Sequence, residues 1–222
     1  MRHYVEKLSP LAEFAVVILG AFGFFFVMYL QAVIWPGAPW RIGYGGFKGL
    51  MAYEVVVFAV LIGFLHVRGW TLDRLGFGGG MKDTLIGLAL VLAVYVACAA
   101  IYWTILAAWP PAEQVMNPYE FSHHSSLPTV IAISIVNPIF EETFVCGYVM
   151  SALKKRTGVW NAISISVAIR LLYHLYQGAA AFITIVPFGV ILAYWFARTG
   201  RLWPVIVAHI IADFIALTGY VL

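Results

Sequence analysis

The sequence predicts an all-α protein, a polytopic bundle of transmembrane helices. Of its 222 residues, 63% are hydrophobic and 10% are charged, whereas soluble domains have about 45–50% apolar and about 25% charged residues. Long uncharged runs recur along the chain, each close to the ~20 residues that cross a ~30 Å hydrocarbon layer as a helix. This composition excludes an ordinary water-soluble globule and makes the lipid bilayer the first expected partner.

Seven apolar runs lie between charged or Pro/Gly-rich breaks, and each is predicted to be one span. They cover residues 11–34, 50–67, 84–107, 128–151, 159–177, 180–197 and 203–221. The first run exceeds the 7–15 residues of a cleavable signal core, so we expect it to be retained. Only Gln177, Gly178 and neighbouring alanines separate the fifth run from the sixth, which indicates either a tight helical hairpin or a broken helix.

No linker divides the chain, so residues 1–222 are expected to form a single domain. Spans one to three, within 1–127, are predicted to be accessory, and 128–222 is predicted to be a four-span core of catalytic type. The basic loop residues fall on one side of a seven-span topology: Arg2, Lys7, Arg68, Arg74, Lys82, Lys154, Lys155, Arg156, Arg198 and Arg201. The opposite side has Arg41 and Lys48. The positive-inside rule then predicts a cytoplasmic N-terminus and an outer C-terminus. We expect a multi-pass protein of an inner or plasma membrane of prokaryotic type.

Charge and cysteine usage exclude some partners and sites. The net charge of +3 is spread over short loops, without the basic and aromatic stripe of a nucleic-acid groove, so no nucleic-acid partner is expected. Cys98 and Cys146 lie in apolar runs, and no CxxC motif occurs, so no disulfide framework is predicted. His123 and His124 are adjacent in an outer loop without a third nearby ligand, which is more typical of solvated surface than of a metal site.

Ionisable side chains cost about 2.5–3.5 kcal/mol each at the centre of a membrane helix on insertion scales, so their presence there predicts a functional site. They concentrate in three of the last four runs, as Glu141 and Glu142, Arg170 and His174, and His209 and Asp213. Apart from Glu13 near the start of the first run, the first three runs have only Gln31, Glu54 and His66. We interpret Gln31 and Glu54 as hydrogen-bonding between helices and His66 as interfacial.

Helical periodicity predicts which of these groups share a face. Residues four apart do, so His209 faces the same way as Asp213, while adjacent residues such as Glu141 and Glu142 diverge by about 100°. We therefore expect one of the two carboxylates to lie in the site and the other to contact a partner side chain behind the site. Pro138 is expected to open the helix ahead of the pair and admit water to Glu141. Counted at 1.5 Å per residue, Glu141, Arg170 and Asp213 all lie roughly 15–17 Å from the cytoplasmic ends of their spans.

Three motifs in residues 128–222 together resemble a known family. They are Glu141-Glu142 followed by Gly147, His174 within Tyr-His-Leu-Tyr-Gln-Gly, and His209-x-x-x-Asp213. This combination resembles the CPBP intramembrane proteases, which include CAAX prenyl endopeptidases and bacteriocin-processing proteins. The resemblance implies a glutamic-type protease that needs no cofactor and hydrolyses a peptide bond of a membrane-embedded or lipidated peptide or protein. It makes Glu141 the general base with Glu142 beside it, His174 its partner on the water, and His209 with Asp213 the oxyanion side.

Two positions depart from the family pattern. The family reads E-E-x-x-x-R and F-x-x-x-H, but the arginine position is Cys146 and the phenylalanine position is Arg170. We hypothesise that the Arg170 guanidinium reaches Glu142 or Glu141 and replaces the missing cation, with Asn137 and Cys146 also supporting the site. Alternatives stay open: a zinc protease with Glu141, His174 and His209 as ligands, although H-E-x-x-H is missing; an inactive scaffold, immunity or sensor protein; and a transporter or proton relay.

Overall fold

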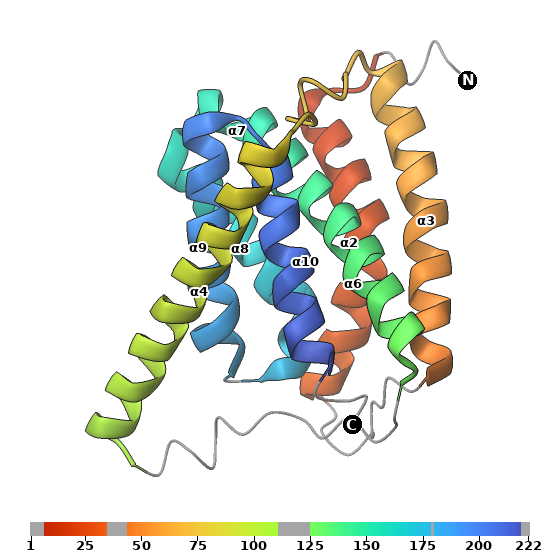
Figure 1. The fold of residues 1–222 in the computed structure, drawn as a ribbon. Helices are drawn as coiled ribbons and strands as arrows, with labels where there is room; N and C mark the ends of the chain where they lie inside the picture. The colour runs from red at the N-terminus through yellow and green to blue at the C-terminus, as the bar shows by residue number, and fades with distance from the viewer. Residues whose placement is uncertain (1–6, 35–43, 111–124, 179, 219–222) are drawn as a thin grey trace.

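A computed structural model describes residues 7–34, 44–110, 125–178 and 180–218, and every regular element within them is a helix (Figure 1). The helices are α2 (Pro10–Ile34), α3 (Tyr44–Val67), α4 (Met81–Ala108), α6 (Leu127–Glu142), the π-helix η1 (Thr143–Tyr148), α7 (Val149–Thr157), α8 (Val159–Tyr173), the 3-10 turn η2 (Leu175–Gln177), α9 (Ala180–Thr199) and α10 (Trp203–Thr218).

Five of the described helical stretches are long and apolar enough to cross a membrane: Pro10–Gln31, Gly46–Val67, Met81–Ala108, Leu127–Thr157 and Ala180–Thr199. The shorter α8 and α10 are also apolar. In Figure 1 these helices run alongside one another, and α2 begins at the end of the bundle opposite to where α10 ends. The predicted polytopic helical bundle is confirmed, whereas the side of the membrane on which each end lies stays a prediction.

The helix that carries Glu141 and Glu142 runs through the middle of the packing. All of η1 is buried. Phe144 and Tyr148 join a hydrophobic cluster with α2, α3 and α8, whereas Cys146 joins a second cluster with α4, α8, α9 and α10. Because η1 takes part in both clusters, the residues just before it are held between the two halves of the bundle.

The fifth and sixth predicted spans form a helical hairpin. The prediction that the fifth span continues to residue 177 is wrong, because α8 ends at Tyr173 and η2 follows. Gly178 has a φ of +59°, a left-handed conformation that glycine adopts without steric cost, and α9 begins two residues later. With 15 residues, α8 is roughly 22 Å long, shorter than the ~30 Å of a hydrocarbon layer. His174 therefore stands at the end of a short helix.

The irregular part of the fourth span follows the glutamates. Pro138 lies inside α6, and the backbone changes to π-helical geometry at Thr143. A side chain on Gly147 would place its Cβ 2.9 Å from the backbone oxygen of Leu75, so glycine lets η1 approach the segment before α4. Single-turn π segments inside α-helices occur frequently at functional sites.

Candidate active site

Six of the predicted site residues border one cavity of about 620 Å³, whereas Glu142 and Cys146 do not line it. Its lining includes Asn137, Glu141, Arg170, His174, His209 and Asp213. Most of the remaining lining is aromatic or aliphatic and comes from α2, α3, α4, α9 and α10. The topology thus brings polar groups from distant parts of the chain to a single apolar-walled cavity.

Hydrogen-bond donors on two helices orient the Glu141 carboxylate. The Tyr173 hydroxyl of α8 donates to its Oε2 at 2.7 Å, and Nδ2 of Asn137, one turn earlier on α6, donates to its Oε1 at 3.0 Å. Arg170 Nη1 lies 3.9 Å from Oε2. Each carboxylate oxygen has two lone pairs, so both oxygens keep capacity to accept a hydrogen bond from water.

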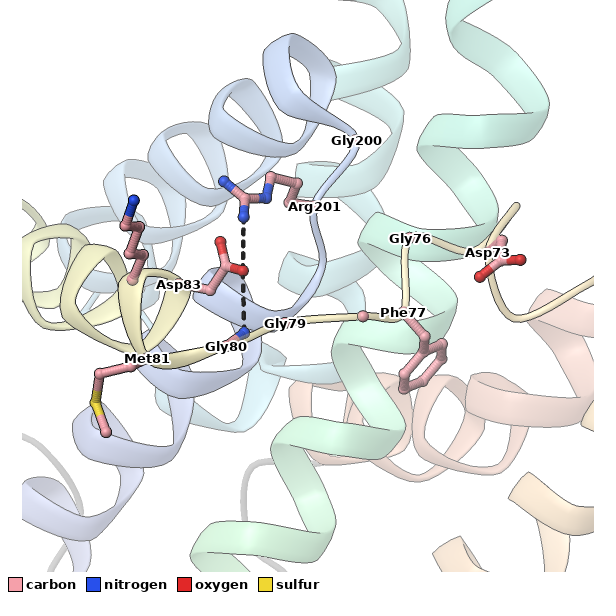
Figure 2. Close-up of a pocket in the computed structure, with 11 residues that line it drawn as sticks. Asp73, Gly76, Phe77, Gly79, Gly80, Met81, Asp83, Gly200 and Arg201 are labelled. Carbon is pink, nitrogen blue, oxygen red and sulfur yellow. Dashed lines mark hydrogen bonds and ion pairs between the residues drawn. The ribbon is translucent and has the colours of Figure 1, made fainter.

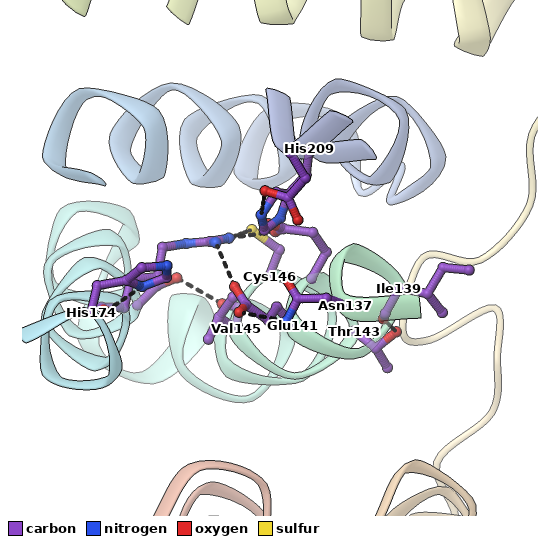
Figure 3. Close-up of polar contacts among 12 residues, drawn as sticks. Asn137, Ile139, Glu141, Thr143, Val145, Cys146, His174 and His209 are labelled. Carbon is purple, nitrogen blue, oxygen red and sulfur yellow. Dashed lines mark hydrogen bonds and ion pairs between the residues drawn. The ribbon is translucent and has the colours of Figure 1, made fainter. Parts of the chain in front are cut away.

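Glu142 points away from the cavity and links three helices. It is fully buried, accepts a hydrogen bond from Arg170 Nη2 of α8, and lies 2.6 Å from Nδ1 of His209 on α10. Cys146 Sγ lies 3.6 Å from the same Arg170 nitrogen (Figure 3). The two carboxylates therefore diverge as their adjacent positions predict, and Arg170 makes the contact with Glu142 that the departures from the family pattern led us to expect.

A glycine on α9 makes room for the Arg170 side chain. A Cβ on Gly189 would lie 3.1 Å from Arg170 Cδ and 3.1 Å from Val167 Cγ2. The guanidinium also sits over the Phe188 ring, with Cζ 5.5 Å from the ring centroid. The position of Arg170 thus depends on close packing between α8 and α9.

His209 is held between two carboxylates. Its Nδ1 faces Glu142 and its Nε2 lies 3.3 Å from Oδ1 of Asp213. Ionised carboxylates only accept hydrogen bonds, so this arrangement suits an imidazole with a hydrogen on each nitrogen. An oxyanion in the cavity would compete with Asp213 for the hydrogen bond from Nε2. It would either share this hydrogen with the Asp213 carboxylate or displace that carboxylate.

The tautomer of His174 follows from its backbone contact. Its Nδ1 lies 3.0 Å from the carbonyl oxygen of Arg170, and a carbonyl only accepts, so Nδ1 has a hydrogen, and in the neutral imidazole Nε2 then has the lone pair. Among the described residues, no three His, Cys, Asp or Glu side chains gather closely enough to hold a metal ion. The alternative zinc ligands Glu141, His174 and His209 are not grouped as a zinc site requires. His123 and His124 lie outside the described residues.

Sequence reasoning missed two residues at this site, Tyr173 and Glu54. Tyr173 lies three positions after Arg170, so helical spacing could have placed its hydroxyl on the same face. Glu54 of α3 is 1% exposed, borders the cavity and accepts a hydrogen bond from Asn137 Nδ2 at 2.7 Å. The interpretation of Glu54 as a helix-linking residue agrees with this contact, but the sequence did not indicate which helix it contacts.

A second hollow of about 660 Å³ lies where the glycine-rich segment before α4 meets the turn between α9 and α10. Oδ2 of Asp83 accepts from Arg201 Nη2 at 2.7 Å and from the Gly80 backbone N–H at 3.2 Å (Figure 2). None of the predicted site residues lines it. These contacts fasten the start of α4 to the α9–α10 turn.

Residues 123–215 match a protein family described as type II CAAX prenyl endopeptidase Rce1-like. This is a protease family, and the match confirms the resemblance that the three motifs indicated. The matched segment contains Asn137, Glu141, Glu142, Cys146, Arg170, His174, His209 and Asp213. Comparison with curated proteins and with solved structures finds no match.

Proposed function

Taking the match of residues 123–215 to a protease family as the premise, we propose that this protein is an intramembrane endopeptidase. It hydrolyses a peptide bond in a membrane-embedded or lipidated peptide or protein. The observation that carries this proposal is that Glu141, His174, His209 and Asp213 border one cavity inside an apolar helical bundle. Groups on separate spans can act on the same bond only when the fold brings them together. Here three spans contribute groups to one cavity.

In the proposed reaction Glu141 acts as general base. Its carboxylate takes a proton from a water molecule, and the resulting hydroxide adds to the carbonyl carbon of the scissile bond. His174 Nε2 accepts a hydrogen bond from the other hydrogen of this water, which stays on the oxygen. Glu141 then gives the proton to the amine nitrogen as the carbon–nitrogen bond breaks, which leaves a carboxylic acid and an amine. Tyr173 and Asn137 hold the base in the orientation that this transfer requires.

His209 stabilises the oxyanion, and the groups behind it keep it charged. Its Nε2 hydrogen points to Asp213 on the cavity wall, where a carbonyl oxygen that gains negative charge can compete for it. Donors of this kind typically contribute about 2.7–4 kcal/mol to the lowering of a barrier. Arg170 compensates the charge of Glu142, so Glu142 can hold His209 without placing an unpaired carboxylate in the core.

A cleavage assay on the full chain in lipid vesicles tests this function. The probes are a farnesylated peptide that ends in a CAAX sequence and the same peptide without the lipid, each with and without 1,10-phenanthroline. We expect cleavage of the lipidated peptide that resists the chelator and falls at least ~100-fold in Glu141→Gln, since general bases contribute about 10²–10⁴-fold. Loss of cleavage in chelator with recovery on added zinc would replace the metal-free mechanism. A folded wild-type chain that cleaves neither peptide would favour the inactive scaffold.

A further inference from the structure

Glu54 places a third carboxyl group at the cavity, in addition to those of Glu141 and Asp213, from a helix outside the family match. It lies on α3, is 1% exposed and borders the same cavity as Glu141. Its Oε1 accepts from Asn137 Nδ2 at 2.7 Å. Its Oε2 is buried and has no hydrogen-bond partner among the described residues. A helix-linking role alone leaves this placement at the active cavity unexplained.

One amide group connects Glu54 with the proposed base. Asn137 Nδ2 donates to Glu54 Oε1 at 2.7 Å and to Glu141 Oε1 at 3.0 Å. A primary amide has two hydrogens on this nitrogen, so each carboxyl group receives one. The contact with Glu54 therefore fixes the rotation of the amide and, with it, the direction of the hydrogen given to Glu141.

The two carboxyl groups have different surroundings. Glu141 has Arg170 at 3.9 Å and the Tyr173 hydroxyl at 2.7 Å, which suit an ionised carboxylate. Within the described part of the chain Glu54 makes no ion pair, and a lone buried charge is strongly disfavoured, so Glu54 is expected to be neutral. A neutral carboxyl still accepts through its carbonyl oxygen, so Glu54 can hold the amide without competing with Glu141 as a base.

We infer that Glu54 is a positioning residue for the proposed hydrolysis, acting through Asn137 on Glu141. The inference rests on the proposed function and extends it to α3, so the site is not complete within residues 123–215. Glu54 does not touch the reacting atoms in this role. It keeps the Asn137 amide turned toward Glu141, and the base is misplaced without it.

A double-mutant cycle tests this role with the full chain in vesicles. Glu54→Leu removes the acceptor, and we expect kcat to fall roughly 10-fold or more with KM changed less than about 2-fold, because small misplacement of a reacting group is costly. Glu54→Gln keeps an uncharged acceptor and should restore kcat to within about 3-fold of wild type. Asn137→Leu should lower kcat as Glu54→Leu does. The double variant should be no worse than Asn137→Leu, since coupled sites are not additive.

Ser134→Ala is the matched control. Ser134 lies on α6 three positions before Asn137, is 1% exposed, and its Oγ has no hydrogen-bond partner among the described residues. It should leave kcat unchanged. If Glu54→Leu does not fold, comparison of Glu54→Asp with Glu54→Gln tests the role instead. The aspartate side chain is one methylene too short to reach Asn137, so kcat should fall in Glu54→Asp. The glutamine side chain reaches Asn137, so kcat should be retained in Glu54→Gln.

The outcomes separate the two proposals. Three outcomes would each overturn the role of Glu54: additive losses in the double variant, equal kcat in the aspartate and glutamine variants, or full kcat in Glu54→Leu. In each case the loss of cleavage in Glu141→Gln still tests the proposed protease activity. A wild-type chain without cleavage would instead overturn the proposed function and remove the positioning role with it.

Discussion

Arg170 places a cation beside Glu142, whereas the pattern of the family that the motifs resemble has its arginine at position 146. Its side chain is 1% exposed, pairs with Glu142 and lies 3.6 Å from Cys146 Sγ. Cys146 is four positions after Glu142, which is one helical turn, so a longer basic side chain there would point to the same carboxylate. We propose that Arg170 takes the place of the family's arginine at this carboxylate, from the neighbouring helix.

Exchange of these two residues tests the relocation. Arg170→Phe leaves Glu142 buried without its guanidinium, and we expect it to lower the free energy of unfolding by about 3–5 kcal/mol and to abolish cleavage. Adding Cys146→Arg to this variant should recover most of both losses, because the guanidinium returns to Glu142. Chemical denaturation of the detergent-solubilised protein and the cleavage assay are the two measurements.

Two further variants make the exchange decisive. Cys146→Arg alone would bring a second guanidinium against Glu142 and should destabilise the protein. Arg198→Phe, at an exposed position near the end of α9, should change stability by less than about 0.5 kcal/mol. If Arg170→Phe and the double variant have the same stability and activity, Arg170 has not replaced the missing cation.

At the level of helices, the packing depends on small residues that sequence patterns mark poorly. Gly87 of α4 packs against Val207 of α10. A Cβ added to Gly87 would lie 2.7 Å from Val207 Cβ and 2.9 Å from the Pro204 backbone oxygen. Small residues let membrane helices approach closely. This contact joins α4 to α10, and α10 carries His209 and Asp213 toward the cavity.

We expect Gly87→Ala to destabilise the protein by about 1–3 kcal/mol, because the new methyl group has no space and one of its neighbours is backbone. Gly63→Ala on α3 is the matched control, since a Cβ there meets nothing within 4 Å and alanine favours the helix by about 0.5–1 kcal/mol. Unfolding of both variants in detergent measures the difference. Equal stability of the two would show that α4 and α10 do not pack this closely.

The sequence was sufficient to predict the helices. It was not sufficient to predict how they are rotated and how they cross one another. Apolar runs identify spans, and ionisable residues at membrane depth identify site candidates, because both signals are local and costly to produce by chance. The expected contact of Arg170 followed from comparing depths along two spans. The contacts of Glu54 with Asn137 and of Tyr173 with Glu141 depend on helix rotation and crossing, which close approaches such as that at Gly189 determine. The π segment after Glu142 likewise has no local sequence signature.

For the whole molecule, the described basic segments meet at one end of the bundle. Arg68, just after α3, pairs with Glu13 of α2 at 2.6 Å, Ser151 of α7 donates to the Arg74 backbone oxygen at 3.2 Å, and Arg201 pairs with Asp83. The end of α4 lies at the opposite end (Figure 1). Contacts of the α3–α4 segment and of the α9–α10 turn therefore agree with the predicted grouping of these basic residues at one end.

The cavity is displaced toward the other end. Its lining includes Phe47 near the start of α3, Tyr102 near the end of α4 and Leu217 near the end of α10, and these helix ends lie away from the basic loops in Figure 1. If the basic end is cytoplasmic, as the positive-inside rule predicts, substrate reaches the site from the outer half of the bilayer. The orientation thus decides which peptides can be substrates in a cell.

Cysteine labelling in intact cells tests this orientation. In a Cys98→Ser background, where Cys146 is fully buried, we introduce Arg156→Cys at the basic end of α7 or Trp109→Cys just after α4, where the tryptophan is 52% exposed. A membrane-impermeant maleimide should label the Trp109→Cys chain in intact cells and the Arg156→Cys chain only after permeabilisation, because the charged reagent does not cross the hydrocarbon layer. Labelling in the reverse order would place the basic loops outside and turn the cavity toward cytoplasmic substrates.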